Sequence, residues 1–138
     1  MTTDTQMLAG VPLFSRCTAA EIEAVTARAL VNEFEAGQLI VSQNTPGTAF
    51  YLVLEGRVDV EKDGTHVGTL GVGEFFGEMS LLDNAPRSAT IRAAEQTRCM
   101  MLSSWDFRAA LEQHPSVAVK LLEVLTQRLR ATDERRER

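Results

Sequence analysis

The chain has 138 residues, of which 44% are hydrophobic and 24% are charged, and its formal net charge is −5. This length suits one compact domain that buries its own core and needs no disulfide or metal to fold. No apolar run is long enough to cross a bilayer, and the polar segment Met1 to Gln6 does not resemble a secretion signal. The acidic balance argues against a nucleic-acid-binding protein.

Two features of the composition bear on location and partners. Cys17 and Cys99 lie far apart and form no metal-binding pair or disulfide framework, so we interpret them as reduced thiols of a cytoplasmic protein. The only basic concentration is the arginine-rich tail from Arg128 to Arg138, which acidic residues interrupt. Because arginines also complement the dipole at a helix end, we expect a solvated helix terminus and no direct nucleic-acid contact.

The first part of the chain, residues 7–30, is predicted to be helical. Thr18 and Glu21 form a T-x-x-E pattern, in which each side chain can cap a backbone amide of the other residue. Ile22 and Val25 then follow at helical spacing.

The central part, about residues 31–102, has the character of a β-structure. Glycines recur every eight to ten residues, at positions 37, 47, 56, 64 and 73, and short β-forming runs lie between them. Val58 and Val60 alternate with acidic residues, as in a half-buried strand, and the Asp63-Gly64 pair is typical of a hairpin turn. Short strands at this spacing, without a long intervening helix, predict an antiparallel sandwich or barrel.

The last part, residues 103–132, is predicted to form two helices. Ser103 and Asp106 give a helix start, and Pro115 ends the first helix or opens the second. The second helix carries a narrow apolar stripe formed by Ala118, Leu122, Leu125 and Leu129, with Leu121 beside it. Two interpretations are equally good: packing against the domain's own barrel, or pairing with the same helix of a second copy in a homodimer.

One segment between two predicted strands can form an anion site. Gly77 allows the backbone to approach a ligand closely, and amides at the start of the short helix that follows point toward an anion. Arg87 supplies a permanently charged guanidinium, whose paired N–H donors match the spacing of phosphate oxygens. Glu78 can accept hydrogen bonds from a sugar hydroxyl. Ser88 adds a further donor and acceptor. Each residue alone would be an ordinary surface residue; their combination inside a β-pattern indicates a site.

This segment, FGEMSLLDNAPRSATIRA, resembles the phosphate-binding cassette of the cyclic nucleotide-binding domain family. That family includes protein kinase regulatory subunits, cyclic-nucleotide-gated channels and bacterial regulators of the catabolite activator type. The resemblance extends over nearly the whole chain, because Val11–Phe14, Phe50–Val58 and Trp105–Pro115 also resemble parts of the family's domain.

The resemblance implies a single domain, residues 1–138, that is mainly β: an antiparallel, jelly-roll-like β-roll (double-stranded β-helix) flanked by α-helices. The helical lead-in would span residues 7–30, the β-roll residues 31–102 with the cassette at 76–91, and two C-terminal helices residues 103–132. Asn44 stands where the family often has glycine in a turn; asparagine tolerates left-handed backbone, so we expect the turn to survive.

The resemblance also implies roles for individual residues. Glu78 would take the ribose 2′-hydroxyl and Arg87 the exocyclic phosphate oxygens. The full expected ligand-binding set is Gly77, Glu78, Met79, Ser80, Arg87, Ser88 and Ala89. The expected apolar wall is Val60, Val67, Leu70, Phe76 and Ile91. The final helix would act as a lid over the base, with Arg128 and Leu129 as candidate contacts.

The implied function is that of a sensor: a cyclic nucleotide, cAMP rather than cGMP by analogy with bacterial-type relatives, repositions the C-terminal helices. After the lid helix the chain ends at Arg138 without a recognisable output domain, so we expect an unidentified effector protein as partner, or an excised fragment of a larger regulator. A rival interpretation is an interaction domain of the same fold that binds no nucleotide. A metal-dependent barrel enzyme is disfavoured because only His66 and His114 are present, so we expect no catalytic residues, metal or cofactor.

Overall fold

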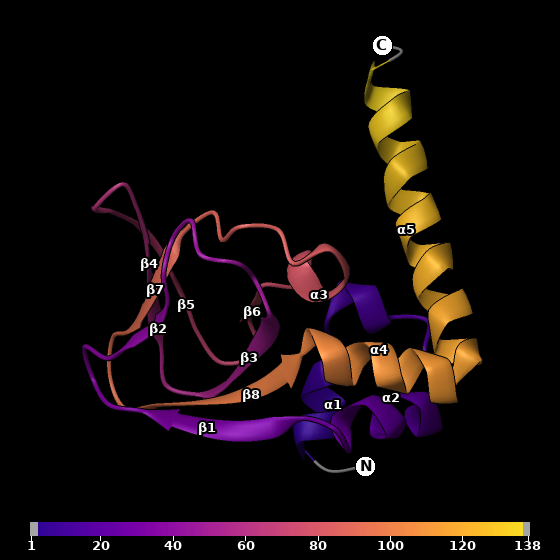
Figure 1. Cartoon of the computed structure of the whole chain (residues 1–138), viewed down its shortest axis with the longest axis horizontal. Coiled ribbons are helices and arrows are strands. Elements are labelled where there is room, and N and C mark those ends of the chain that lie inside the picture. Colours follow the sequence, from indigo (N-terminus) through magenta and orange to yellow (C-terminus); the bar gives the residue numbers. More distant parts are fainter. Residues whose placement is uncertain (1–2, 137–138) are drawn as a thin grey trace.

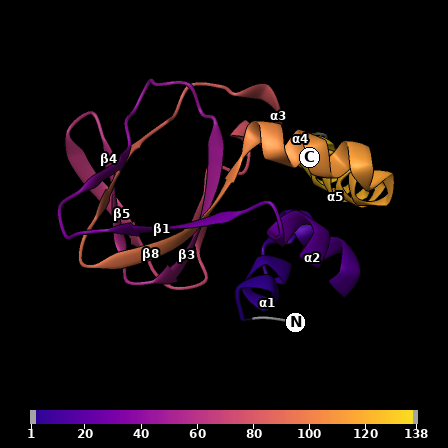
Figure 2. The same ribbon diagram turned by 60° about the horizontal axis from the view of Figure 1, so that its bottom comes forward.

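The computed structural model describes residues 3–136, in which eight strands form two antiparallel sheets flanked by helices (Figures 1 and 2). The N-terminal elements are α1 (Thr3–Ala9), the 3₁₀ helix η1 (Pro12–Phe14) and α2 (Ala19–Thr26). The strands are β1 (Leu30–Phe34), β2 (Leu39–Val41), β3 (Ala49–Glu55), β4 (Val58–Lys62), β5 (Thr65–Leu70), β6 (Phe75–Phe76), β7 (Thr90–Ala93) and β8 (Thr97–Ser103). The remaining helices are α3 (Ser80–Asp83), α4 (Ser104–Gln113) and α5 (Pro115–Arg136).

The strands are arranged in the orders β1-β8-β3-β6 and β2-β7-β4-β5, and all pairs are antiparallel. Strand β3 is buried on both faces. Its residues Phe50, Leu52 and Leu54 pack in the core shared with the helices, whereas Tyr51 and Val53 belong to the core between the sheets. Figure 2 shows the strands on one side of the molecule and α1, α2, α4 and α5 on the other. One strand thus joins the two cores.

The local signals in the sequence have the expected structures. Thr18 and Glu21 form a complete capping box at the start of α2, and the Ser103 hydroxyl accepts from the Asp106 amide at the start of α4. Asp63 and Gly64 both have positive φ, of 52° and 80°, as a two-residue hairpin turn between β4 and β5 requires. Pro115 opens α5, where its missing N–H costs no hydrogen bond.

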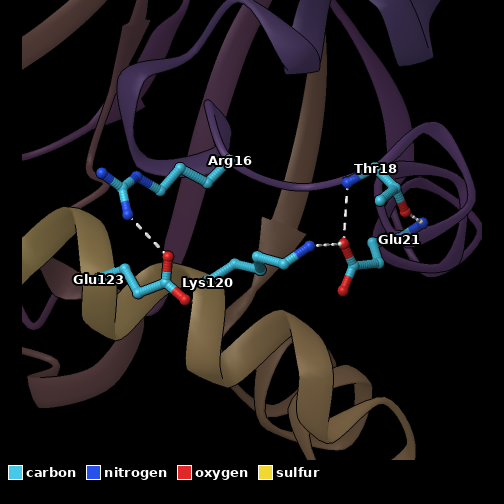
Figure 3. A network of polar contacts seen from close by, with 5 residues as sticks. All are labelled: Arg16, Thr18, Glu21, Lys120 and Glu123. Atoms are coloured by element: carbon cyan, nitrogen blue, oxygen red, sulfur yellow. Dashed lines mark hydrogen bonds and ion pairs between the residues drawn. The ribbon is translucent and has the colours of Figure 1, made fainter.

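Two ion pairs fasten the base of α5 to the N-terminal helices (Figure 3). The Lys120 ammonium lies 2.8 Å from the Glu21 carboxylate, which also accepts from the Thr18 amide, and Arg16 lies 2.7 Å from Glu123. The hydrogen bond from Lys120 is the main cause that lowers the pKa of Glu21 to about 2. Since buried Val117, Leu121 and Val124 also pack here, the first half of α5 is anchored to the body.

The second half of α5 is different, because it extends away from the rest of the molecule (Figure 1). Two residues of the apolar stripe seen in the sequence, Leu122 and Leu129, are 61% and 63% exposed. The helix packs instead through Val117, Leu121 and Val124, on a neighbouring face. Packing against the protein's own barrel therefore does not account for Leu122 and Leu129.

The expected fold class is confirmed: a mainly β, antiparallel roll with a helical N-terminal segment and two C-terminal helices. The sequence did not single out strands β1 and β6, the latter of only two residues. Residues 1–2 and 137–138, which include the ends of the single domain expected over 1–138, lie outside the described residues. Among residues 3–136, none of the helices has the length and apolar character needed to cross a bilayer.

Candidate ligand-binding site

The expected cassette lies between β6 and β7 and contains the single turn of α3 (Figure 1). Its conformation depends on left-handed backbone at two residues. Gly77 has φ of 83°, and Asn84, with φ of 53°, caps α3 and donates its amide to the Ser80 carbonyl. The chain can therefore turn sharply at both ends of the α3 turn, which directs the segment from Gly77 to Ala89 around a cavity.

Arg87 is the best-positioned side chain of the cassette. It is only 8% exposed, and its Nη2 donates to the carbonyl of Ala49 on β3. Its backbone amide donates to Thr45 and its carbonyl accepts from Asn44, both at 2.8 Å. Asn44 itself has φ of 68°, so the turn that was expected to tolerate asparagine forms. The guanidinium is thus fixed from both backbone and side chain.

The Arg87 guanidinium has no carboxylate partner among residues 3–136. Burial lowers its pKa from the ordinary arginine value, but a guanidinium remains charged in proteins. An unpaired charge that is removed from water is costly, and an anion placed beside it would relieve that cost. The site is therefore electrostatically prepared for an anion.

Gly77 packs directly against this guanidinium. A Cβ placed on Gly77 would collide with Nη1 of Arg87 and would lie 2.7 Å from the Ala49 carbonyl oxygen. Glycine is thus needed here for two reasons: its positive φ, and the close approach of its backbone to Arg87.

Glu78 is the second charged group of the site. Its Oε2 is buried without a hydrogen-bond partner, and the closest cation is the Nη2 of Arg128 on α5, at 3.8 Å. Burial raises the pKa of the Glu78 carboxyl, while the charge of Arg128 lowers it. The carboxylate therefore retains an unused acceptor next to the final helix.

The cavity beside Arg87 and Glu78 has a volume of about 540 Å³, within the range of small-molecule sites. Eleven of the twelve expected ligand-binding and wall residues line it: Val60, Leu70, Phe76, Gly77, Glu78, Met79, Ser80, Arg87, Ser88, Ala89 and Ile91. Their contact with a ligand stays a prediction. Of the other lining residues, Ala85 and Pro86 lie within the expected cassette, whereas the sequence did not identify Val41, Lys62 and Phe75.

Val67 is the expected wall residue that does not line the cavity. Strand β5 pairs with β4 through Gly68 opposite Val60 and then His66 opposite Glu61, so Val67 is the extra residue of a β-bulge. It is 55% exposed. The expectation placed the Val67 side chain in the cavity wall. A bulge depends on how two strands pair, so the residue pattern of one strand does not predict it.

A second, smaller cavity of about 220 Å³ lies between the cassette and α5. It is lined mainly by apolar side chains, among them Leu81, Phe107 and Leu125, and Arg128 also lines it. Glu78 and Met79 line both cavities. Of the two candidate lid residues, Arg128 thus lies beside the cassette, whereas Leu129 is exposed and lines neither cavity.

Comparison with known proteins gives consistent results. The model of the cyclic nucleotide-binding domain family matches residues 31–114. The chain is 37% identical over 131 residues to the cyclic AMP receptor protein of Thermus thermophilus, covering 90% of this chain and 60% of that protein. It is 38% identical over 97 residues to the cGMP-dependent protein kinase of Eimeria tenella, covering 70% of this chain and 10% of the kinase. The chain thus spans less than two thirds of these relatives.

Among solved structures, the N-terminal domain of a transcriptional regulator from Streptomyces coelicolor A3(2) has a TM-score of 0.87 to this chain at 29% identity. The match covers 93% of this chain and 95% of that domain. The similarity therefore includes the flanking helices as well as the sheets.

The packing of Gly77 leads to a first prediction. Gly77→Ala should destabilise the protein by more than about 1 kcal/mol, because the change adds both left-handed strain and a collision with Arg87. Gly73→Ala is a matched control, since Gly73 has φ of 86° but a Cβ there meets no atom within 4 Å. Urea unfolding of both variants measures the difference. Equal losses would show that Gly77 serves only the backbone turn.

Proposed function

The chain belongs to the cyclic nucleotide-binding domain family, and on that premise we propose that it is a sensor module that binds a 3′,5′-cyclic nucleotide and signals through α5. The observation that carries the proposal is the buried Arg87 guanidinium, which borders the larger cavity without a carboxylate partner among the described residues. A cyclic phosphodiester carries one negative charge, which would pair with the single positive charge of this guanidinium.

The other groups of the cavity suit the rest of such a ligand. The backbone at Gly77 can approach the phosphate beside Arg87, and Ser88 and Ala89 lie in the same segment. Glu78, whose buried Oε2 lacks a donor, would accept from the ribose 2′-hydroxyl. Met79 and Ser80 complete the expected contacts, while Val60, Leu70, Phe76 and Ile91 form the apolar walls. We propose cAMP as the preferred nucleotide, by analogy with bacterial-type relatives such as the Thermus receptor.

Glu78 offers a route from the ligand to α5. Its carboxylate faces Arg128, and within residues 3–136 this is the one ion pair that joins the second half of α5 to the cassette. A ribose hydroxyl that donates to Glu78 changes how strongly the carboxylate holds Arg128. Ligand binding and the position of α5 are then linked through one side chain, and an effector protein would respond to the helix.

The exposed stripe of α5 favours self-association as part of the same proposal. Val119, Leu122 and Leu129 are all more than half exposed, and Leu122 and Leu129 lie two helical turns apart on one face. A parallel copy of the helix could cover them. The two free cysteines, Cys17 and Cys99, agree with the proposed cytoplasmic location.

Two other functions are compatible with the fold, and ligand titration separates the first of them from this proposal. An interaction domain that binds no nucleotide would leave the buried charge of Arg87 without a role. A regulatory fragment of a larger transcription factor, channel or enzyme would bind the same ligand, and the length of the parent reading frame distinguishes it.

Calorimetric titration of nucleotide-free protein with cAMP and cGMP tests the function. We expect binding to the wild type, and a loss of about tenfold to over a hundredfold in Arg87→Ala, because a hydrogen bond to a charged group contributes roughly 1.5–3 kcal/mol. Arg57→Ala is the control, since Arg57 is exposed and lies outside the cavity lining. If the wild type gives no heat of binding with either nucleotide at millimolar concentration, the result would support an interaction domain that binds no nucleotide.

The pH dependence of binding tests the pairing of Glu78 with Arg128. Arg128 lowers the pKa of Glu78, so Arg128→Met should raise that pKa further. Because the ionised carboxylate accepts the ribose hydroxyl, affinity falls as the pH drops through this pKa, and in the variant it should fall at a higher pH. Arg130→Met, at an exposed position, is the control. Identical pH profiles for all three proteins would exclude the coupling.

Sedimentation equilibrium tests the self-association. We expect the wild type to have about twice the chain mass, and the double variant Leu122→Glu with Leu129→Glu to be monomeric, because like charges would face each other in a dimer. Gln127→Glu places one acid on another, exposed face of the helix and should leave the mass unchanged. A monomeric wild type would rule out the dimer.

A further inference from the structure

One residue of the cavity breaks the pattern of the strand that carries it. Successive side chains of β4 alternate between two faces. On the outer face Asp59 pairs with His66 at 3.3 Å, and Glu61 pairs with Arg92 at 3.7 Å. The inner row is Val58, Val60 and then Lys62, so a cation stands where the alternation calls for an apolar residue. Because the outer acids already have partners, Lys62 is not needed to balance them.

Lys62 lines the larger cavity and has no hydrogen-bond or ion-pair partner in the part of the chain that the structure describes. It is also exceptional among the lining residues. Apart from the cassette at 76–91, the lining consists of Val41, Val60, Lys62, Leu70 and Phe75. Lys62 is therefore the sole polar side chain that the strands outside the cassette contribute to this cavity, within residues 3–136.

The strand opposite Lys62 leaves open space beside the cavity wall. Gly68 pairs directly with Val60, and a Cβ at Gly68 would meet no atom within 4 Å. The bulge at Val67 removes the next side chain from the lining. Apolar Val41, Leu70 and Ile91 complete this side of the cavity, which comes from the sheet β2-β7-β4-β5. Such a surface suits the faces of a purine base.

We propose that Lys62 is a specificity-determining residue that binds the acceptor edge of the base; the inference rests on the proposed function of the cavity. With phosphate at Arg87 and ribose at Glu78, the base occupies the remaining space along this sheet. An ammonium group only donates hydrogen bonds. Guanine presents two acceptors, O6 and N7, on one edge, whereas adenine presents N7 beside an amino donor.

Lys62 accordingly favours a 6-oxopurine over a 6-aminopurine. Lys62 raises the affinity for cGMP more than the affinity for cAMP. The ratio by which the protein prefers cAMP is therefore smaller than it would be without Lys62. The long, exposed side chain of Lys62 loses conformational freedom when it binds, which keeps the effect moderate.

Titration of Lys62→Met with cAMP, cGMP and cyclic inosine monophosphate tests the proposal. Methionine keeps the length of the side chain and removes its charge. We expect the affinity for cGMP to fall about tenfold and that for cAMP by less than about threefold. Cyclic inosine monophosphate should follow cGMP, because it shares O6 and N7 and lacks the 2-amino group. Lys62→Arg, which keeps the donors, should retain the wild-type ratio of cGMP to cAMP affinity.

Arg92→Gln is the matched control, because it removes one positive charge from the outer face of the same sheet. It should change all three affinities equally and slightly. Equal losses of affinity for cAMP and cGMP in Lys62→Met would overturn the proposal, since Lys62 would then act on the phosphate. No loss of affinity for either nucleotide would also overturn it. If the wild type binds none of the three ligands, the proposed function itself fails, and this result is distinct from a wild type that binds without regard to Lys62.

Discussion

The buried guanidinium of Arg87, which has no carboxylate partner among residues 3–136, is the constraint around which this domain is organised. Three separate segments hold Arg87: β3 through the Ala49 carbonyl, the turn at Asn44 and Thr45 through backbone hydrogen bonds, and Gly77 through close packing. Holding an unpaired charge away from water costs several kcal/mol, which the surrounding core must offset. Because the fold itself holds the guanidinium in place, an anion would meet a site that is already organised.

Glu78 has the opposite charge and a different role. Its carboxylate lines both cavities and faces a cation that belongs to the C-terminal helix. A ligand that uses this carboxylate therefore alters an interaction of α5 without touching α5 itself. In the proposed function, thermodynamic reciprocity requires that a partner which moves Arg128 would change the affinity for the nucleotide by the same factor by which the nucleotide changes the affinity for the partner.

Much of this structure could be predicted from the sequence because the signals are local. The Thr18–Glu21 cap and the Asp63-Gly64 turn involve neighbouring residues, and the cassette is a continuous segment. The features that the sequence could not place depend on long-range register. Val67 leaves the cavity because of a bulge that depends on pairing with β4, and the packed face of α5 depends on where the helix docks. The pairing of Glu78 with Arg128 joins residues 50 positions apart, and no pattern in the sequence connects them.

The anchoring of α5 has a mechanical consequence. Ion pairs and buried side chains fix the first half of the helix as far as Val124, whereas beyond it Leu125 packs partly against the core and Arg128 pairs with Glu78. At 1.5 Å per residue, Arg128 lies roughly 6 Å from Val124, and the helix end at Arg136 lies roughly 18 Å from it. If α5 were to tilt rigidly about Val124, a displacement at Arg128 would be about three times as large at Arg136. A small displacement beside the cassette would then reach the far end of the helix enlarged, as the proposed signalling through α5 requires.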